Sequence, residues 1–359
     1  MHGLSKTIQG GQYVRFFQYN HPTRKLNQHL KYFFRNLKNV DRRSNFLPIN
    51  QYFHPDFVIH LNGAPVLRQK FENFFNTFKK SSASNRALLI DQFYSSQDIK
   101  NILENVRFNG NAIKKRSIPP RLRNRVSELF RHMYPSTLSS IGNLTDHYTL
   151  IYNSLASKVC PFCGVQQIQI PHYARQDYDH ILNQAYYPFT TANMNNLAPM
   201  CDQCNRTYKG GKDVLYDGAN RRCYAYPYET SFNIEVLLDG SLLPDRNANF
   251  NGTWVVNFSP NNDFVSTWAN VFEMRYRYSE LILSTNFDSW LEHFISNIKM
   301  RSIVVKTNPD LIAQFQIDST LYLERPHLEL NIVKGGLFRF LANCNDLAFY
   351  TSIITRINS

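Results

Sequence analysis

Two Cys-x-x-Cys pairs place the strongest constraint on this chain of 359 residues. Each pair is a short turn that can point two sulfur atoms at one ion, and four thiolates at such spacings suit tetrahedral zinc. A site with four thiolates is closed to substrate, so we expect structural Zn²⁺. Disulfides are the weaker alternative, because no signal peptide opens the chain. The predicted ligands are Cys160, Cys163, Cys201 and Cys204.

The residues between and directly beside the two pairs have the chemistry of a hydrolytic centre. Histidine has the ordinary pKa closest to neutral pH, so His180 is the predicted general base. Asp179 and Asn205 supply oxygen atoms of the kind that Mg²⁺ or Mn²⁺ prefers. Asn196 is expected to hold the imidazole of His180 in one orientation through its side-chain amide. The local pattern predicts a strand, a loop, a second strand and a short helix that ends at Gly210-Gly211.

This segment resembles the HNH endonuclease family, the zinc-supported branch of the ββα-metal nucleases, over residues 160–212 alone. The resemblance implies a ββα-metal module that hydrolyses DNA with a divalent ion and leaves a 5′-phosphate and a 3′-hydroxyl. It departs from many relatives in having Leu182-Asn183-Gln184 where they have Leu-Pro-Lys. It also has asparagine where many have histidine after the last cysteine. The matching positions are the two Cys-x-x-Cys pairs, Asp179-His180, Asn196-Leu197 and Asn205.

Positive charge is concentrated in the N-terminal part of the chain. Residues 1–158 hold 24 lysines and arginines against 8 aspartates and glutamates, whereas residues 213–359 hold 12 against 16. Neutralised phosphates dominate nucleic-acid affinity, so this asymmetry predicts DNA as the partner. A solvated linker or helix face is the alternative for each basic cluster. The predicted nucleic-acid contacts are Lys114, Lys115, Arg116, Arg121, Arg123, Arg125, Arg206 and Lys209.

The apolar pattern predicts an α+β protein that is mostly helical. We expect a basic helical region over residues 1–158, the nuclease module over 159–212 and a small antiparallel sheet with helices over 213–359. Leu67, Phe71 and Phe74 recur at helical spacing. Helices are expected at about 265–283, 286–300, 309–323 and 335–356. No run approaches the 18 apolar residues of a membrane span, so we expect a cytoplasmic protein.

Two functions of different classes follow from these patterns. The first is an endonuclease that hydrolyses DNA. For this same chemistry the resemblance to HNH nucleases implies a further setting, that of an effector of an anti-phage defence system under the control of an ATPase or sensor subunit. The alternative is a catalytically inactive zinc-knuckle subunit that binds nucleic acid or docks to a partner. Cutting that depends on a divalent ion and on His180 distinguishes the first from the second.

Overall fold

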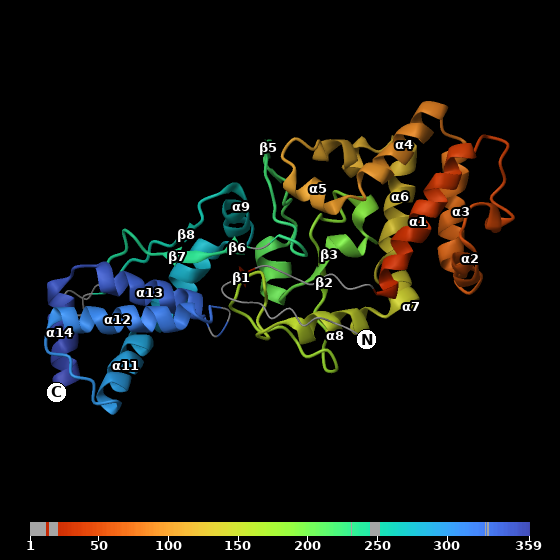
Figure 1. Ribbon diagram of the computed structural model, residues 1–359. Helices are drawn as coiled ribbons and strands as arrows, with labels where there is room; N and C mark the ends of the chain where they lie inside the picture. The colour runs from red at the N-terminus through yellow and green to blue at the C-terminus, as the bar shows by residue number, and fades with distance from the viewer. Residues whose placement is uncertain (1–11, 14–20, 231, 245–251, 327, 329) are drawn as a thin grey trace. The chain divides into compact units, whose positions relative to one another are not determined.

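The computed structural model describes residues 12–13, 21–230, 232–244, 252–326, 328 and 330–359 (Figure 1). Helices predominate, and the short strands pair two by two as antiparallel ladders. The predicted mostly helical α+β class is confirmed at this level. Among the described residues, no helix combines the length and the apolar character needed to cross a membrane.

Two compact units, interleaved in the sequence, make up the described chain. The helical unit comprises described residues within 16–155 and 168–230, and the C-terminal unit comprises those within 1–15, 156–167 and 231–359. These boundaries do not coincide with the predicted limits at residues 158 and 212, because contacts between distant segments define a unit and sequence composition does not report them.

The helical unit carries the chemistry-bearing segment. Its α-helices are α1 (Lys25–Asn36), α2 (Pro55–Asn62), α3 (Pro65–Lys79), α4 (Ala83–Ser95), α5 (Ile99–Glu104), α6 (Pro120–His132), α7 (Leu138–Gly142) and α8 (Leu144–Ser154). Its strands are β2 (Tyr178–His180), β3 (Leu197–Pro199), β4 (Tyr216–Asp217) and β5 (Asn220–Arg221). A π-helix, η9 (Gln203–Lys209), follows β3.

Phenylalanines form the core of this unit. The rings of Phe34 and Phe93 stack with centroids 3.8 Å apart, and Phe189 meets Phe130 edge-on at 5.2 Å. Such pairs contribute about 0.5–1.5 kcal/mol each beyond the burial of their area. Phe189 lies two residues before Thr191, so this core fixes the loop that leads back to strand β3.

Helix α3 buries the stripe that its sequence predicts. The side chains that face the core are Leu67, Phe71, Phe74, Phe75 and Phe78. With this face covered, α3 packs against α6. The two helices therefore form one wall of the helical unit.

The C-terminal unit combines small sheets with helices. Its strands are β1 (Gln12–Tyr13), β6 (Phe232–Asn233), β7 (Glu235–Leu237) and β8 (Asn257–Ser259), and Val236 of β7 lies opposite Phe258 of β8. The small antiparallel sheet predicted after residue 213 is confirmed. Its helices are α9 (Asp263–Val271), α10 (Met274–Tyr276), the π-helix η10 (Arg277–Leu283), α11 (Ser284–Met300), α12 (Asn308–Leu323), α13 (Asn331–Asn343) and α14 (Leu347–Asn358).

Two of the predicted C-terminal helices are broken in the structure. The expected helix at 265–283 is interrupted at Glu273, which has a φ of 53°. The expected helix at 335–356 is two helices, since Asn345 has a φ of 52° and the side chain of Asp346 accepts a hydrogen bond from the backbone N–H of Phe349 at 2.9 Å. A capping aspartate starts a new helix, and the apolar pattern alone did not reveal it.

Candidate metal centre and catalytic pocket

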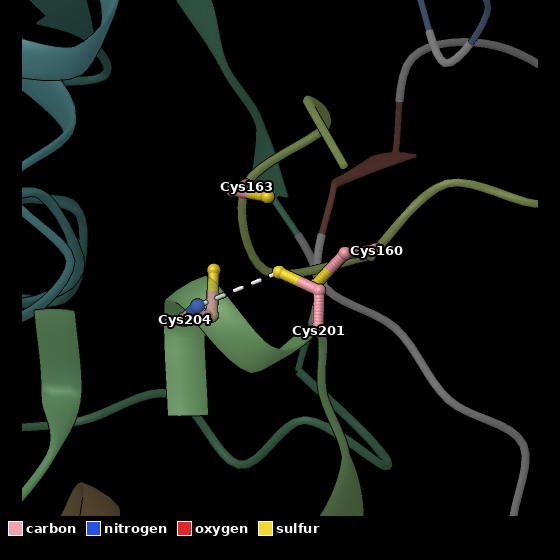
Figure 2. Close-up of side chains that lie close together, drawn as sticks. All are labelled: Cys160, Cys163, Cys201 and Cys204. Atoms are coloured by element: carbon pink, nitrogen blue, oxygen red, sulfur yellow. Dashed lines mark hydrogen bonds between the residues drawn. The ribbon is translucent and has the colours of Figure 1, made fainter. Parts of the chain in front are cut away.

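Four buried cysteines form a cluster that suits a metal ion. The sulfur atoms of Cys160, Cys163, Cys201 and Cys204 lie within 4.8 Å of one another, and Figure 2 shows the side chains converging. Tetrahedral zinc with bonds of about 2.3 Å requires sulfurs about 3.8 Å apart, so a small adjustment accommodates the ion. These residues are thiols and not disulfides. The predicted four-cysteine ligand set is confirmed as a cluster that can hold a structural metal such as zinc.

Buried aromatic side chains of the C-terminal unit hold the turn that carries the first pair of cysteines. The indole N–H of Trp268 donates to the carbonyl of Phe162 at 2.6 Å, and the hydroxyl of Tyr278 donates to the carbonyl of Cys163 at 2.9 Å. The backbone N–H of Cys160 donates to the carbonyl of Gln166 at 2.7 Å. These three bonds fix the turn through backbone groups, and none of them uses a sulfur atom.

Strands β2 and β3 form a hairpin that presents the candidate catalytic residues. They pair antiparallel, with Asp179 opposite Ala198 and His180 opposite Leu197. Helix η9 ends at Gly210, which has a φ of 46° and donates its N–H to the carbonyl of Asn205 at 2.9 Å. The predicted order of strand, loop, strand and helix is present. The helix is of the π type, a form often found at functional sites.

His180 is held in a single tautomer. Its Nε2 lies 3.1 Å from the carbonyl oxygen of Thr191, and because a carbonyl only accepts, Nε2 carries the proton. Nδ1 is therefore the proton-accepting nitrogen. Burial, with a contribution from the positive charge of Lys209, lowers the pKa of His180 to about 4, so the ring is neutral at pH 7. The ring of Tyr134 meets it edge-on with centroids 4.5 Å apart.

Asn196 acts on the loop and not on the imidazole, which corrects the prediction for this residue. Its side chain is fully buried and donates to the carbonyl of Leu182 at 3.0 Å and to the hydroxyl of Thr190 at 3.0 Å. Its Oδ1 accepts from the backbone N–H of Leu182 at 2.7 Å. Asn196 thereby holds the chain on both sides of the loop, and the neighbouring Thr191 carbonyl holds the ring of His180.

Lys209 is buried against Asp179, which contradicts its predicted contact with phosphate. Its side chain is 1% exposed, and its Nζ donates to Asp179 Oδ1 at 3.0 Å and to the carbonyl of His180 at 2.9 Å. Nζ also lies 3.0 Å from Asp179 Oδ2, but this oxygen has no hydrogen-bond partner. Burial raises the pKa of Asp179, and the charge of Lys209 acts in the opposite direction. Helical periodicity cannot show that a lysine turns inward to a buried carboxylate.

One pocket of about 380 Å³ brings Asp179, His180 and Asn205 together. Asn205 makes no side-chain hydrogen bond with the described part of the chain. Its amide oxygen and the carboxylate of Asp179 are hard oxygen donors of the kind that Mg²⁺ takes, and Lys209 Nζ lies 3.0 Å from both oxygens of that carboxylate. Arg206 lies at the exposed rim, where it pairs with Asp177 at 2.8 Å. Its predicted phosphate contact stays a prediction.

The predicted basic arm splits into two groups. Lys114 is an internal residue, because it pairs with Asp213 at 2.7 Å and its side chain is only 14% exposed. Arg123 donates to the backbone carbonyls of Arg116 and Ile118, at 2.7 and 3.3 Å. The structure therefore contradicts nucleic-acid contact by Lys114. Arg123 is half-buried and uses only Nη2 for its two bonds, so its nucleic-acid contact stays a prediction. Nucleic-acid contact stays a prediction for Lys115, Arg116, Arg121 and Arg125.

His147 contacts Tyr178 of strand β2 and makes the free energy of unfolding depend on pH in the acid range. Its Nδ1 lies 2.6 Å from the hydroxyl of Tyr178, and burial lowers its pKa from 6.5 to about 4. The unfolded chain therefore binds more protons between these values, and the free energy of unfolding falls as the pH drops from about 6.5 towards 4. We expect a loss of about 2 kcal/mol from His147 between pH 7 and pH 5.

Chemical denaturation of the full chain at pH 7 and pH 5 measures this loss. The His147→Gln variant should lose less stability between these pH values than the wild type. The matched variant at the exposed His172, His172→Gln, should show the wild-type loss. Equal losses in the wild type and in His147→Gln would contradict the assignment.

Two residues of the site are not among the motif positions that the sequence singled out. Thr191 contributes a backbone carbonyl, which any residue type supplies, so the residue type at this position gives no signal in the sequence. Tyr134 lies far upstream of His180, and no local pattern connects the two. Neither a family model nor a curated protein nor a solved structure matches this chain.

Proposed function

We propose that this protein is a metal-dependent endonuclease that hydrolyses phosphodiester bonds of DNA at a zinc-supported centre of the HNH type. One observation carries the proposal. His180 is a neutral imidazole whose Nε2–H is fixed by the Thr191 carbonyl, and its ring lines the same pocket as Asp179 and Asn205. A base beside oxygen donors for a divalent ion is the set that metal-assisted hydrolysis requires.

Each residue has a distinct part in the proposed reaction. Nδ1 of His180 accepts a proton from the attacking water, and the Thr191 carbonyl stabilises the imidazolium that forms. Asp179 Oδ2 and the Asn205 amide oxygen are the atoms that would hold Mg²⁺ or Mn²⁺. When bound, such an ion stabilises the charge on the scissile phosphate. The cysteine cluster would hold Zn²⁺ for the fold and not for the reaction.

Supercoiled plasmid tests this proposal. Protein dialysed free of loosely bound ions should convert the plasmid to the nicked form only after Mg²⁺ or Mn²⁺ is added. Nicking should precede linearisation, because one such centre cuts one strand at a time. Excess EDTA is a secondary control, since it also removes zinc from thiolates. Absence of cutting with either ion would contradict a nuclease that acts without a partner.

One observation favours the alternative of a non-catalytic subunit that binds nucleic acid. Lys209 places its ammonium 3.0 Å from both oxygens of Asp179, and this charge opposes the approach of a divalent ion. The alternative predicts that the wild-type protein binds DNA and leaves it intact with every divalent ion. Control by an ATPase or sensor subunit in an anti-phage system stays a prediction, which free cutting by the purified protein would weaken.

A further inference from the structure

A second pocket lies between helices α3 and α6 of the helical unit, outside the cysteine-bounded segment. Its volume is about 440 Å³. Lys70 of α3, Arg131 of α6 and Lys115 line it, together with the polar side chains of Asn124 and Ser127. We call this pocket the α6 groove. The sequence singled out Lys115 as a nucleic-acid contact, but it gave no reason to group that residue with Lys70 or Arg131.

Among the described residues, the three cations of the α6 groove have no bonded counter-ion. Within the described chain, the side chains of Lys70, Lys115 and Arg131 form no hydrogen bond or ion pair. Glu128 is the one carboxylate among the lining residues, and Arg125 engages it at 3.0 Å. Like charges gathered at one pocket repel, so an anion that enters the groove lowers the free energy of the folded chain.

The polar groups of the α6 groove suit a phosphate. The Asn124 amide supplies N–H donors for an anion. The hydroxyl of Ser127 gives its proton to the carbonyl of Arg123 at 3.0 Å and so offers no donor to an anion in this conformation. Burial, with a contribution from the charge of Lys70, lowers the pKa of His132, so this residue adds a neutral imidazole to the lining. Cations with neutral donors are the groups that bind backbone phosphates.

The chain connects the α6 groove directly to the catalytic pocket. Arg131 and His132 line the groove, and Tyr134, two residues further on, lines the pocket of His180. The backbone N–H of Lys115 donates to the carbonyl of Tyr186 at 2.7 Å, in the loop that follows strand β2. Residues 124–131 extend over about 10 Å of helix axis, which corresponds to about three phosphates of one strand.

We infer that the α6 groove binds backbone phosphates of the nucleic acid that flank the scissile position in the catalytic pocket. The inference rests on the proposed function for its choice of nucleic acid as the occupant. It extends that function by assigning the substrate a path along α6, outside the segment that resembles HNH nucleases. Lys70, Lys115 and Arg131 are the binding residues, and none of them takes part in the hydrolysis.

Binding of a fluorescently labelled DNA duplex, followed by anisotropy, tests this inference. The full chain carries His180→Ala so that the duplex is not cut, and Kd is measured between 50 and 200 mM salt. Each lost phosphate contact lowers the slope of log Kd against log salt by about 0.9. The groove variant adds Lys70→Gln, Lys115→Gln and Arg131→Gln to this protein. Its slope should therefore be lower by about 2.7. The ratio of Kd at 200 mM to Kd at 50 mM should fall by about 40-fold.

A matched variant removes the same charge elsewhere in the helical unit. It adds Arg42→Gln, Arg68→Gln and Lys80→Gln to the His180→Ala protein, which replace exposed cations that line neither pocket. Its slope of log Kd against log salt should fall by less than about 1. Equal slopes in the groove variant and the matched variant would overturn the inference. A groove variant that loses binding of inorganic phosphate but keeps DNA binding would overturn it too, because the groove would then be a site for small anions.

The binding assay also separates this inference from the proposed function. If the protein never cuts plasmid but its groove variant shows the lower slope, the inference about the α6 groove stands and a nuclease that acts without a partner is refuted. If the protein cuts plasmid but its groove variant shows no change of slope, the proposed nuclease stands and the inference about the α6 groove is refuted. A His180→Ala protein that fails to bind DNA at 50 mM salt refutes the groove as a nucleic-acid site.

Discussion

His180→Ala is expected to reduce metal-dependent cleavage of plasmid DNA by roughly 100-fold to 10,000-fold, the usual contribution of a positioned general base. The reason is geometric. The Thr191 carbonyl holds the Nε2–H of this ring, so Nδ1 is the nitrogen that accepts a proton, and alanine removes it. Initial rates of nicking at saturating Mg²⁺ measure the loss, and zinc content shows whether the variant keeps its metal.

His172→Ala is the matched control for this substitution. His172 lies in the same segment but is exposed and does not line the pocket of His180. Cleavage by this variant should stay within about twofold of the wild type, since surface substitutions away from a site have small effects. A His180→Ala protein that cuts at nearly the wild-type rate would exclude His180 as the base and favour a contaminating nuclease.

Loss of the metal at the cysteine cluster is expected to have the largest effect on stability. We expect about one zinc ion per chain, and structural zinc sites of this type contribute on the order of 10 kcal/mol to folding. Cys201→Ser removes one of four convergent sulfur atoms, so it should abolish stoichiometric zinc binding and lower the thermal midpoint strongly. Metal analysis after gel filtration and thermal unfolding measure the two effects.

Cys223→Ser is the matched control for the cysteine cluster. Cys223 is also buried, at 8% exposed, but it is not among the four clustered residues. This variant should keep its zinc, and its thermal midpoint should change by the few degrees that a small buried substitution causes. Full zinc content in Cys201→Ser, or none in the wild type, would contradict the zinc assignment while leaving the assignment of His180 open to its own test.

Local patterns were sufficient for the features that depend on neighbours in the sequence. The spacing of Cys160, Cys163, Cys201 and Cys204 predicted their convergence, because two short turns with two sulfurs each suit one tetrahedral ion. The stripe of Phe71, Phe74 and Phe78 predicted the buried face of α3, because helical periodicity places these residues on one side. The hairpin of β2 and β3 followed in the same way from its flanking residues.

Contacts between distant segments decided what the catalytic pocket contains. Sequence pattern predicted that Lys209 contacts phosphate, but the tertiary structure buries it against Asp179, because an isolated carboxylate is costly to bury without a counter-ion. Lys114 likewise pairs with Asp213 and is not available to DNA. The chain itself determined which residues could do chemistry. Only the tertiary structure decided which charges are neutralised internally and which, as at Lys70 and Arg131, have no bonded counter-ion among the described residues.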